Sequence, residues 1–323
     1  MKDVCSTTDM LTQLISFDTT SSKSNKPMID FIIEFLNRYN IACNIGSNHE
    51  GTKGDLIATI GPMVEGGIVL SGHTDVVPVD GQDWDTNPFK LIKKNKLLFG
   101  RGTSDMKGFI AVVLSLVPEI LALNLKIPLH LAFSYDEEIG CLGAPGLIAR
   151  LIKDLPMPMG AIIGEPTGMK LVNAHKGGSL FETEVTGYPG HASQTQAGVN
   201  AISVAAECIV FLNSKAKAFT IDGTRDERME PPYNTINIGV IDGGTAGNII
   251  AGSCRFTWGC RSIINRDVDE LIKQFSDHCN NKLLPSLVEI NRDVKITTKK
   301  ISSVPPLMQV EENPVEAVLR QLT

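Results

Sequence analysis

The chain of 323 residues lacks several features that would each indicate a particular class of protein. It has no apolar run approaching the roughly 18 residues that a membrane-spanning helix needs. It has no excess of basic residues, because 30 Lys and Arg stand against 36 Asp and Glu, giving a net charge of -6. Such a chain offers no large basic field to nucleic acid or to an acidic membrane. We therefore expect neither among its partners.

Cysteine pairs with metal-binding or redox spacing are absent as well. The seven cysteines are scattered, odd in number and contain no Cys-x-x-Cys pair, which fits reduced thiols better than a disulfide framework. The first twenty residues contain no basic segment followed by an apolar block, so no secretory signal is indicated. With 42% hydrophobic and 20% charged residues, the composition is that of an ordinary soluble globular protein. We expect a cytoplasmic location.

The first half of the chain alternates strand patterns with helix patterns. Short apolar runs predict strands at 41–45, 55–60, 67–70, 129–135 and 161–164, and helical spacing predicts helices at 9–15, 27–40, 109–123 and 144–153. This alternation indicates an α/β domain with a parallel or mixed sheet flanked by helices. Ligands of such sheets bind beyond the strand ends.

The pattern changes after about Gly178. Strands are predicted at 180–186, 235–241, 249–260 and 289–299, with helices at 199–213 and 268–283. The order β-α-β-β-α-β is that of a ferredoxin-like α+β domain. We therefore expect a first domain at 1–178, an inserted domain at 179–292, and a return to the first domain at 293–323 with a helix at 314–322.

Acidic and histidine residues follow several of the predicted strands. Asp136-Glu137-Glu138 follows the apolar run 129–133, and His73, Asp105 and Glu165 follow apolar runs or stand in loops close to them. Taken singly, each has an ordinary explanation: a solvated acidic turn, a structural histidine, or a helix cap for Glu165. Their recurrence at successive strand ends favours one metal site along a sheet edge.

The residue types fit a hydrolytic centre with two cations. Such a centre needs a bridging carboxylate, terminal His or carboxylate ligands, and a free carboxylate that takes a proton from water. Imidazole and carboxylate ligands suit zinc. Asp75, two residues after His73 on an extended chain, is placed to orient the imidazole. Asp105 is a plausible bridge, and the acidic pair offers both a ligand and a base.

Four segments together resemble the co-catalytic zinc metallopeptidase family, which includes acetylornithine deacetylase, succinyl-diaminopimelate desuccinylase, aminoacylase and carboxypeptidase-type members. They are 70–78 (LSGHTDVVP), 100–108 (GRGTSDMKG), 136–138 (DEE) and 164–167 (GEPT). The likeness extends from about residue 9 to at least Arg261. It implies a zinc-peptidase-like catalytic domain whose inserted domain serves as a lid and as the surface of a homodimer.

The resemblance also implies roles for individual residues. His73 and Glu165 would bind one zinc, Asp105 would bridge, and Glu138 would bind the second zinc, with cobalt as an alternative metal. Glu137 would then be the general base, and Asp75 would support His73. In the inserted domain, His191, Asn248 and Arg261 would contact substrate, with His191 near the scissile carbonyl, in its own or a partner's site. Cys260 and Ser262 replace the Asp and Pro that often flank this arginine in the family.

One family feature has no counterpart in the sequence. The last ligand of the second zinc comes from a histidine near the family's C-terminus, and here no histidine follows His278. We expect a chain that is truncated, or completed by another polypeptide, with a weakened second metal site.

The activity implied by the resemblance is removal of an acyl group from an N-acyl amino acid, a small-molecule substrate. The flanks of the motifs favour N-acetylornithine, in arginine biosynthesis, with desuccinylation or another peptide or acyl-amino-acid hydrolysis as alternatives. An alternative of a different class is an inactive homologue that retains the fold and partial metal binding.

Overall fold

The computed structural model describes residues 6–322, which form two compact units. The first unit comprises the described residues up to Val172 together with those from Val310 onward, and the second is Asn173–Gln309. Each unit has its own hydrophobic core. The chain thus leaves the first unit, builds the second, and returns.

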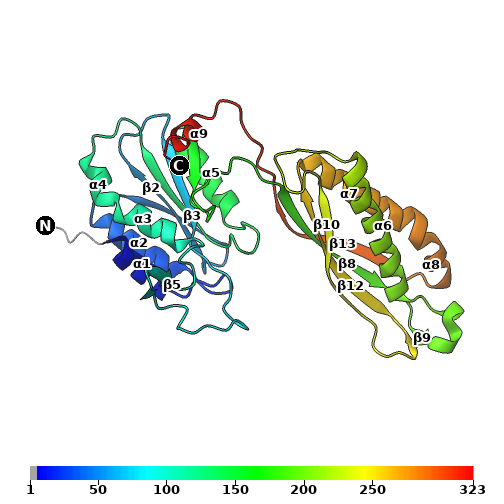
Figure 1. The fold of residues 1–323 in the computed structure, drawn as a ribbon. Coiled ribbons are helices and arrows are strands. Elements are labelled where there is room, and N and C mark those ends of the chain that lie inside the picture. The colour runs from blue at the N-terminus through cyan, green and yellow to red at the C-terminus, as the bar shows by residue number, and fades with distance from the viewer. Residues whose placement is uncertain (1–5, 323) are drawn as a thin grey trace. The chain divides into compact units, whose positions relative to one another are not determined.

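A mixed five-stranded sheet forms the centre of the first unit (Figure 1). Its order is β1 (Cys43–Ser47), β2 (Gly54–Ile60), β6 (Leu129–Ser134), β3 (Ile68–His73) and β7 (Gly160–Ile163). The β1–β2 and β2–β6 pairs are antiparallel, whereas β3 runs parallel to both β6 and β7. A separate hairpin joins β4 (Ile92–Lys94) and β5 (Leu97–Phe99). The predicted α/β class is confirmed.

Helices cover both faces of this sheet. On one face α1 (Thr7–Ser16), α2 (Lys26–Asn37) and α3 (Lys107–Ser115) bury their apolar sides against residues such as Leu56, Leu131 and Phe133. On the other face, α5 (Ala144–Asp154) packs Leu147 and Leu151 over the sheet. The short helix α9 (Pro314–Leu319) adjoins β7.

The single helix expected at 109–123 is two helices. The first, α3, ends at Ser115, and α4 (Val117–Ala122) begins after Leu116. Pro118 lies in the first turn of α4, where its missing N–H leaves no hydrogen bond unmade. Inside one continuous helix the same proline would remove a hydrogen bond and clash with the preceding turn.

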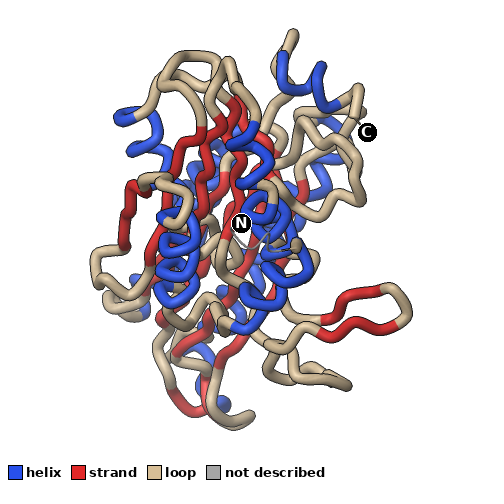
Figure 2. The backbone as a smooth tube through the Cα atoms, turned by 90° about the vertical axis from the view of Figure 1, so that its left-hand side faces the viewer, coloured by secondary structure: helices blue, strands red, loops and turns tan. Residues whose placement is uncertain are grey.

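The second unit is an antiparallel sheet with the strand order β10-β12-β8-β13. These strands are β10 (Thr235–Gly243), β12 (Ser253–Ser262), β8 (Gly177–Thr186) and β13 (Lys295–Val304). Two helices, α6 (Ala201–Asp222) and α7 (Asn265–His278), contribute to its core. The resulting β-α-β-β-α-β order and strand arrangement match the expected ferredoxin-like topology. Figure 2 shows the backbone turned by 90° from the view of Figure 1, with helices in blue and strands in red.

Shorter elements complete the second unit. The strands β9 (Gly190–His191) and β11 (Ile249–Ile250) pair with each other, and a 3-10 helix, η1 (Ala192–Ala197), follows β9. After α7 the chain continues through a π-helix, η2 (Cys279–Leu283), and α8 (Leu284–Ile290). The predicted strand at 289–299 therefore begins later, at Lys295.

The return to the first unit also comes later than residue 293. Strand β13 pairs with β8 from Lys295 opposite Thr186 to Val304 opposite Gly178, so it belongs to the second unit. The compact division falls after Val172 and before Val310. Strand pairing, which apolar periodicity alone does not specify, accounts for the difference from 179–292.

Within residues 6–322, no helix combines the length and apolar character needed to cross a membrane.

Candidate metal centre

Three parallel strands of the first unit bring their carboxyl ends to the same edge of the sheet. Strand β3 ends at His73, and β6 ends at Ser134, just before the acidic turn. Strand β7 ends two residues before Glu165. Asp105 comes from the loop that precedes α3. Residues that lie far apart in the chain therefore meet beyond the strand ends, where α/β sheets bind ligands.

Three of the predicted ligands form one cluster. The Nε2 atom of His73 lies 3.0 Å from Oδ1 of Asp105 and 3.6 Å from Oε1 of Glu165. One potential ligand atom from each residue lies within 4.8 Å of the other two. The imidazole is buried, whereas the side chains of Asp105 and Glu165 remain 49% and 37% exposed. The cluster is thus fixed on one side and open to a ligand on the other.

The orientation of His73 leaves one ring nitrogen for the cluster. Its Nδ1 atom lies 2.9 Å from the backbone carbonyl oxygen of Asp75 and 3.5 Å from that residue's Oδ1. A carbonyl oxygen only accepts, so Nδ1 donates its proton there. In the neutral ring, the form that binds a metal, the lone pair of Nε2 then faces the carboxylates.

The carboxylates shift one another's protonation. Burial, together with the charge of Asp105, raises the pKa of Glu138 to about 7. Burial also raises the pKa of Glu165, and Asp105 again contributes. Burial alone would lower the pKa of His73, but the hydrogen bond and charge of Asp75, with the charges of Glu165 and Glu137, outweigh it and raise that pKa to about 9. Without a metal the ring is therefore protonated on both nitrogens near neutral pH, and a bound cation would take the place of the Nε2 proton. Acids crowded in this way favour a bound cation.

Asp75 connects His73 to the acidic turn. Its carboxylate is fully buried and accepts hydrogen bonds from Ser21 Oγ at 2.7 Å and from the backbone N–H groups of Glu137 at 3.1 Å and Glu138 at 3.3 Å. Burial opposes its ionisation, but hydrogen bonds from His73 and Ser21 lower its pKa. One ionised carboxylate therefore orients both the histidine and the two glutamates.

The sequence interpretation missed the partners of this turn. Asp136, the first of the three acids, is buried and pairs with Lys53, whose Nζ lies 2.8 Å from Oδ1. Cys141 donates its thiol hydrogen to Oε1 of Glu137 at 3.4 Å. The only signal in the sequence was that crowded acids need a cation nearby. The sequence did not indicate that this cation is the side chain of Lys53.

The predicted substrate residues of the second unit do not all lie together. His191 on β9 pairs with Ile249, and the backbone carbonyl of Asn248 accepts from the N–H of Ala192 at 3.0 Å, so His191 and Asn248 are neighbours. Arg261 stands eight residues beyond Ser253 along β12 (261 − 253), roughly 25 Å at the rise of an extended strand. Arg261 and His191 thus lie towards opposite ends of the sheet.

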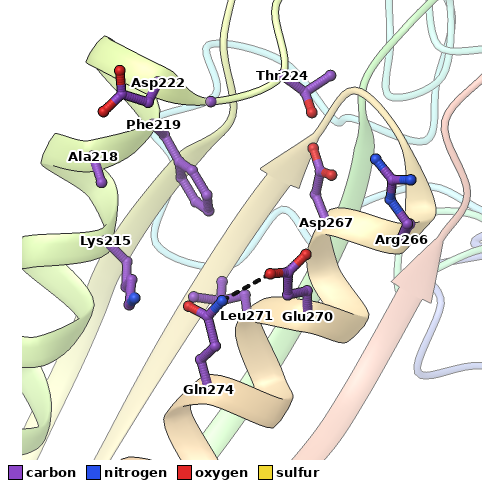
Figure 3. Close-up of a pocket in the computed structure, with 11 residues that line it drawn as sticks. Lys215, Ala218, Phe219, Asp222, Thr224, Arg266, Asp267, Glu270, Leu271 and Gln274 are labelled. Carbon is purple, nitrogen blue, oxygen red and sulfur yellow. Dashed lines mark hydrogen bonds between the residues drawn. The ribbon is translucent and has the colours of Figure 1, made fainter.

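A cavity of about 300 Å³ in the second unit is a different feature (Figure 3). It lies between the end of α6 and the first turns of α7 and includes none of the predicted site residues. Its charged lining is partly engaged already, since Gln274 donates to Glu270 at 2.9 Å and Asn234 donates to Asp267 at 2.6 Å. Asn234 is buried and has a structural role, because its side chain also accepts from the backbone N–H of Ile263 at 2.8 Å.

Comparisons with known proteins show the family of this chain. The profile of the peptidase family M20/M25/M40 matches residues 69–322. An acetylornithine deacetylase of Pasteurella multocida is 34% identical over 294 residues, covering 84% of this chain and 73% of the relative. One of Myxococcus xanthus is 36% identical over 258 residues, covering 78% of this chain and 66% of the relative.

Solved structures show the same fold. A metallo-carboxypeptidase of Sulfolobus solfataricus superposes with a TM-score of 0.73 at 18% identity, covering 98% of this chain and 81% of the other. A dinuclear metal-binding peptidase of Bacillus subtilis gives a TM-score of 0.61 at 14% identity, covering 98% and 80%. The extent of the profile match and the identity to the curated relatives show that this chain belongs to the peptidase family M20/M25/M40.

Proposed function

We propose that the protein is a metal-dependent amidohydrolase that removes an acyl group from an N-acyl amino acid. The observation that carries this proposal is the cluster of His73, Asp105 and Glu165, with the lone pair of Nε2 facing two carboxylates. Imidazole and carboxylate donors fit zinc, and cobalt accepts the same donor set.

The chain's residues divide the work of such a centre. His73 and Glu165 would hold one zinc ion, Asp105 would bridge, and Glu138 would hold a second ion. A bound pair of zinc ions would polarise the scissile carbonyl and lower the pKa of the attacking water. Asp75 keeps the ring of His73 in the orientation that binding requires.

Glu137 is proposed as the proton carrier. Neither Glu137 nor Glu138 belongs to the cluster of three ligands, and Asp75 fixes the backbone of both, so the choice of Glu137 as the base follows the resemblance of the acidic segment to the family. As general base it would take the proton of the attacking water, and as general acid it would pass that proton to the leaving amine nitrogen.

N-acetylornithine is the first substrate to test, because the curated relatives quoted above are acetylornithine deacetylases. The proposal places the enzyme in arginine biosynthesis in the cytoplasm. A guanidinium such as that of Arg261 suits the substrate carboxylate through its planar pair of donors. The separation of His191 from Arg261 supports a role for His191 in the site of a second subunit of a homodimer.

The test combines metal content with turnover. The purified chain, loaded with Zn²⁺ and freed of excess metal, is analysed by plasma spectroscopy and assayed with N-acetylornithine and with N-succinyl-diaminopimelate. Bound zinc with release of acetate from N-acetylornithine supports the proposal. Turnover of N-succinyl-diaminopimelate alone would mean that the enzyme is a desuccinylase. No turnover of any N-acyl amino acid would favour an inactive homologue that retains the fold.

A further inference from the structure

A buried ion pair lies behind the acidic turn. Nζ of Lys53 lies 2.8 Å from Oδ1 of Asp136, and the two residues are only 7% and 8% exposed. The same Nζ donates to the backbone carbonyl of Ser21 at 2.7 Å. Both charged groups are therefore shielded from solvent and tied to specific neighbours.

Stability alone is a poor explanation for this pair. Taking a lysine and an aspartate out of water costs several kcal/mol for each ion, and well-packed apolar residues at such places are often as stable. What a buried pair can provide is a defined geometry, because a change of conformation that separates the two ions leaves each buried without its counter-charge. The question is which geometry depends on it.

The turn that follows β6 is the first part of that geometry. Asp136 has a left-handed backbone, with φ of 54°, which residues other than glycine adopt reluctantly. Its carbonyl accepts from the N–H of Leu142 at 3.0 Å, and the carbonyl of Glu137 accepts from the N–H of Cys141 at 2.9 Å. The ion pair anchors the side chain of Asp136 inward while the chain reverses around Glu137 and Glu138.

Ser21 supplies the second part. Its carbonyl accepts from Lys53, and its hydroxyl donates to Oδ2 of Asp75 at 2.7 Å. Asp75 in turn accepts from the N–H groups of Glu137 and Glu138 and lies against the ring of His73. Lys53 is therefore bonded directly to the acidic turn and, through Ser21, to the residue that orients His73.

We infer that Lys53 and Asp136 are a positioning pair that fixes Glu137 and Glu138 relative to His73. The inference rests on the proposed function of those residues, although the effect on metal binding can be measured without turnover. Neither member of the pair touches substrate; both act through the backbone of the acidic turn and through Ser21. Removal of one charge should shift the turn and leave its partner buried without compensation.

The first unit contains a matched control. Arg150 on α5 pairs with Asp55 on β2, and Asp55 is only 2% exposed. The hydrogen bonds of this guanidinium go to Asp55 and join the helix to the sheet. Arg150→Met thus breaks an ion pair of the same unit that makes no bond to Ser21, Asp75 or the acidic turn.

The experiment compares Lys53→Met and Asp136→Asn with Arg150→Met. Affinity for Zn²⁺ is measured by competition with a chromophoric chelator, the free energy of unfolding by urea, and kcat and KM with N-acetylornithine. Loss of a residue behind the metal ligands typically weakens metal binding or activity by about 10- to 100-fold, and we expect that loss in the two site variants. We expect kcat to fall with little change in KM, since misplacement of the base affects the transition state. Arg150→Met should lower stability without weakening zinc binding.

A double variant keeps the test decisive if a single variant fails to fold. Lys53→Met with Asp136→Asn removes both charges and keeps a residue that tolerates the left-handed backbone at position 136, so we expect a folded protein with weakened zinc binding. Zinc affinity equal to that of the Arg150→Met control, in any folded variant of the pair, would overturn the inference. A parent protein that binds zinc but turns over no substrate would instead count against the proposed function. The comparison of zinc affinities would still test the positioning pair in that case.

Discussion

The two ring nitrogens of His73 face different surroundings, and this difference determines what the residue can do. Nδ1 donates to the carbonyl of Asp75, while Nε2 faces Asp105 and Glu165. In the neutral, metal-binding form of the ring, the proton is therefore held on the buried side and the lone pair on the ligand side. A histidine whose ring was reversed would offer an N–H to the carboxylates and could not bind a cation.

The neighbouring glutamates Glu137 and Glu138 should separate metal binding from catalysis. Glu137→Gln should lower kcat by about 100-fold or more while zinc stays bound, because a general base is not a ligand. Glu138→Gln should instead lower the amount of bound zinc. Plasma spectroscopy and steady-state kinetics on both variants provide the check. Loss of metal in Glu137→Gln with retention in Glu138→Gln would mean that the two roles are reversed.

At the scale of single elements, β12 organises the second unit. Its Trp258 is fully buried, stacks on Phe181 of β8 at 4.5 Å between ring centroids and meets Phe275 of α7 edge-on at 5.4 Å. The indole N–H donates to the hydroxyl of Thr183 at 3.0 Å. One side chain therefore joins two strands and a helix and satisfies its own polar group.

Truncation of Trp258 should strongly destabilise the second unit. Trp258→Ala removes a large buried ring, which typically costs about 3 to 5 kcal/mol in the free energy of unfolding. Trp84→Phe serves as the control, since this tryptophan lies partly exposed in a loop of the first unit, under Arg101. Urea unfolding followed by circular dichroism measures both. A cost for Trp258→Ala no larger than that for Trp84→Phe would contradict the packing described.

At the scale of the whole molecule, two cores are built by one chain that crosses between them twice. The candidate centre draws on the first unit alone, from His73, Asp105 and Glu165. The second unit contains none of the clustered ligands but carries His191, Asn248 and Arg261. The proposed metal ligands and the proposed substrate contacts in the second unit thus belong to different units of the chain.

Zinc should stabilise the first unit selectively. A ligand that binds only the folded state adds about 2.7 kcal/mol of stability when its free concentration is 100 times Kd. In Trp84→Phe the remaining tryptophan, Trp258, reports on the second unit, whereas circular dichroism reports on both. Circular dichroism should show two transitions, and we expect zinc to raise the midpoint of the one that belongs to the first unit. The midpoint of the fluorescence transition, which belongs to the second unit, should not change. Equal shifts by both probes would show that the units unfold as one.

Much of the architecture followed from local patterns in the sequence. Apolar runs and helical spacing predicted the alternation of the first unit and the β-α-β-β-α-β order of the second, because the burial of one face leaves a periodic trace in the chain. The strand-end position of His73 and Glu165 was visible for the same reason. Errors arose at boundaries, as at Pro118 and at β13, where a single residue or a strand partner decided the outcome.

Other properties were decided only by the tertiary structure. Lys53 and Asp136 are 83 residues apart, and Ser21 and Asp75 are 54 apart, so no periodicity links them. The ring orientation of His73, the limits of the two units and the distance between His191 and Arg261 likewise depend on which segments pack together. A sequence pattern records how much of each residue is buried, whereas the partner it meets in the interior is determined by the fold as a whole.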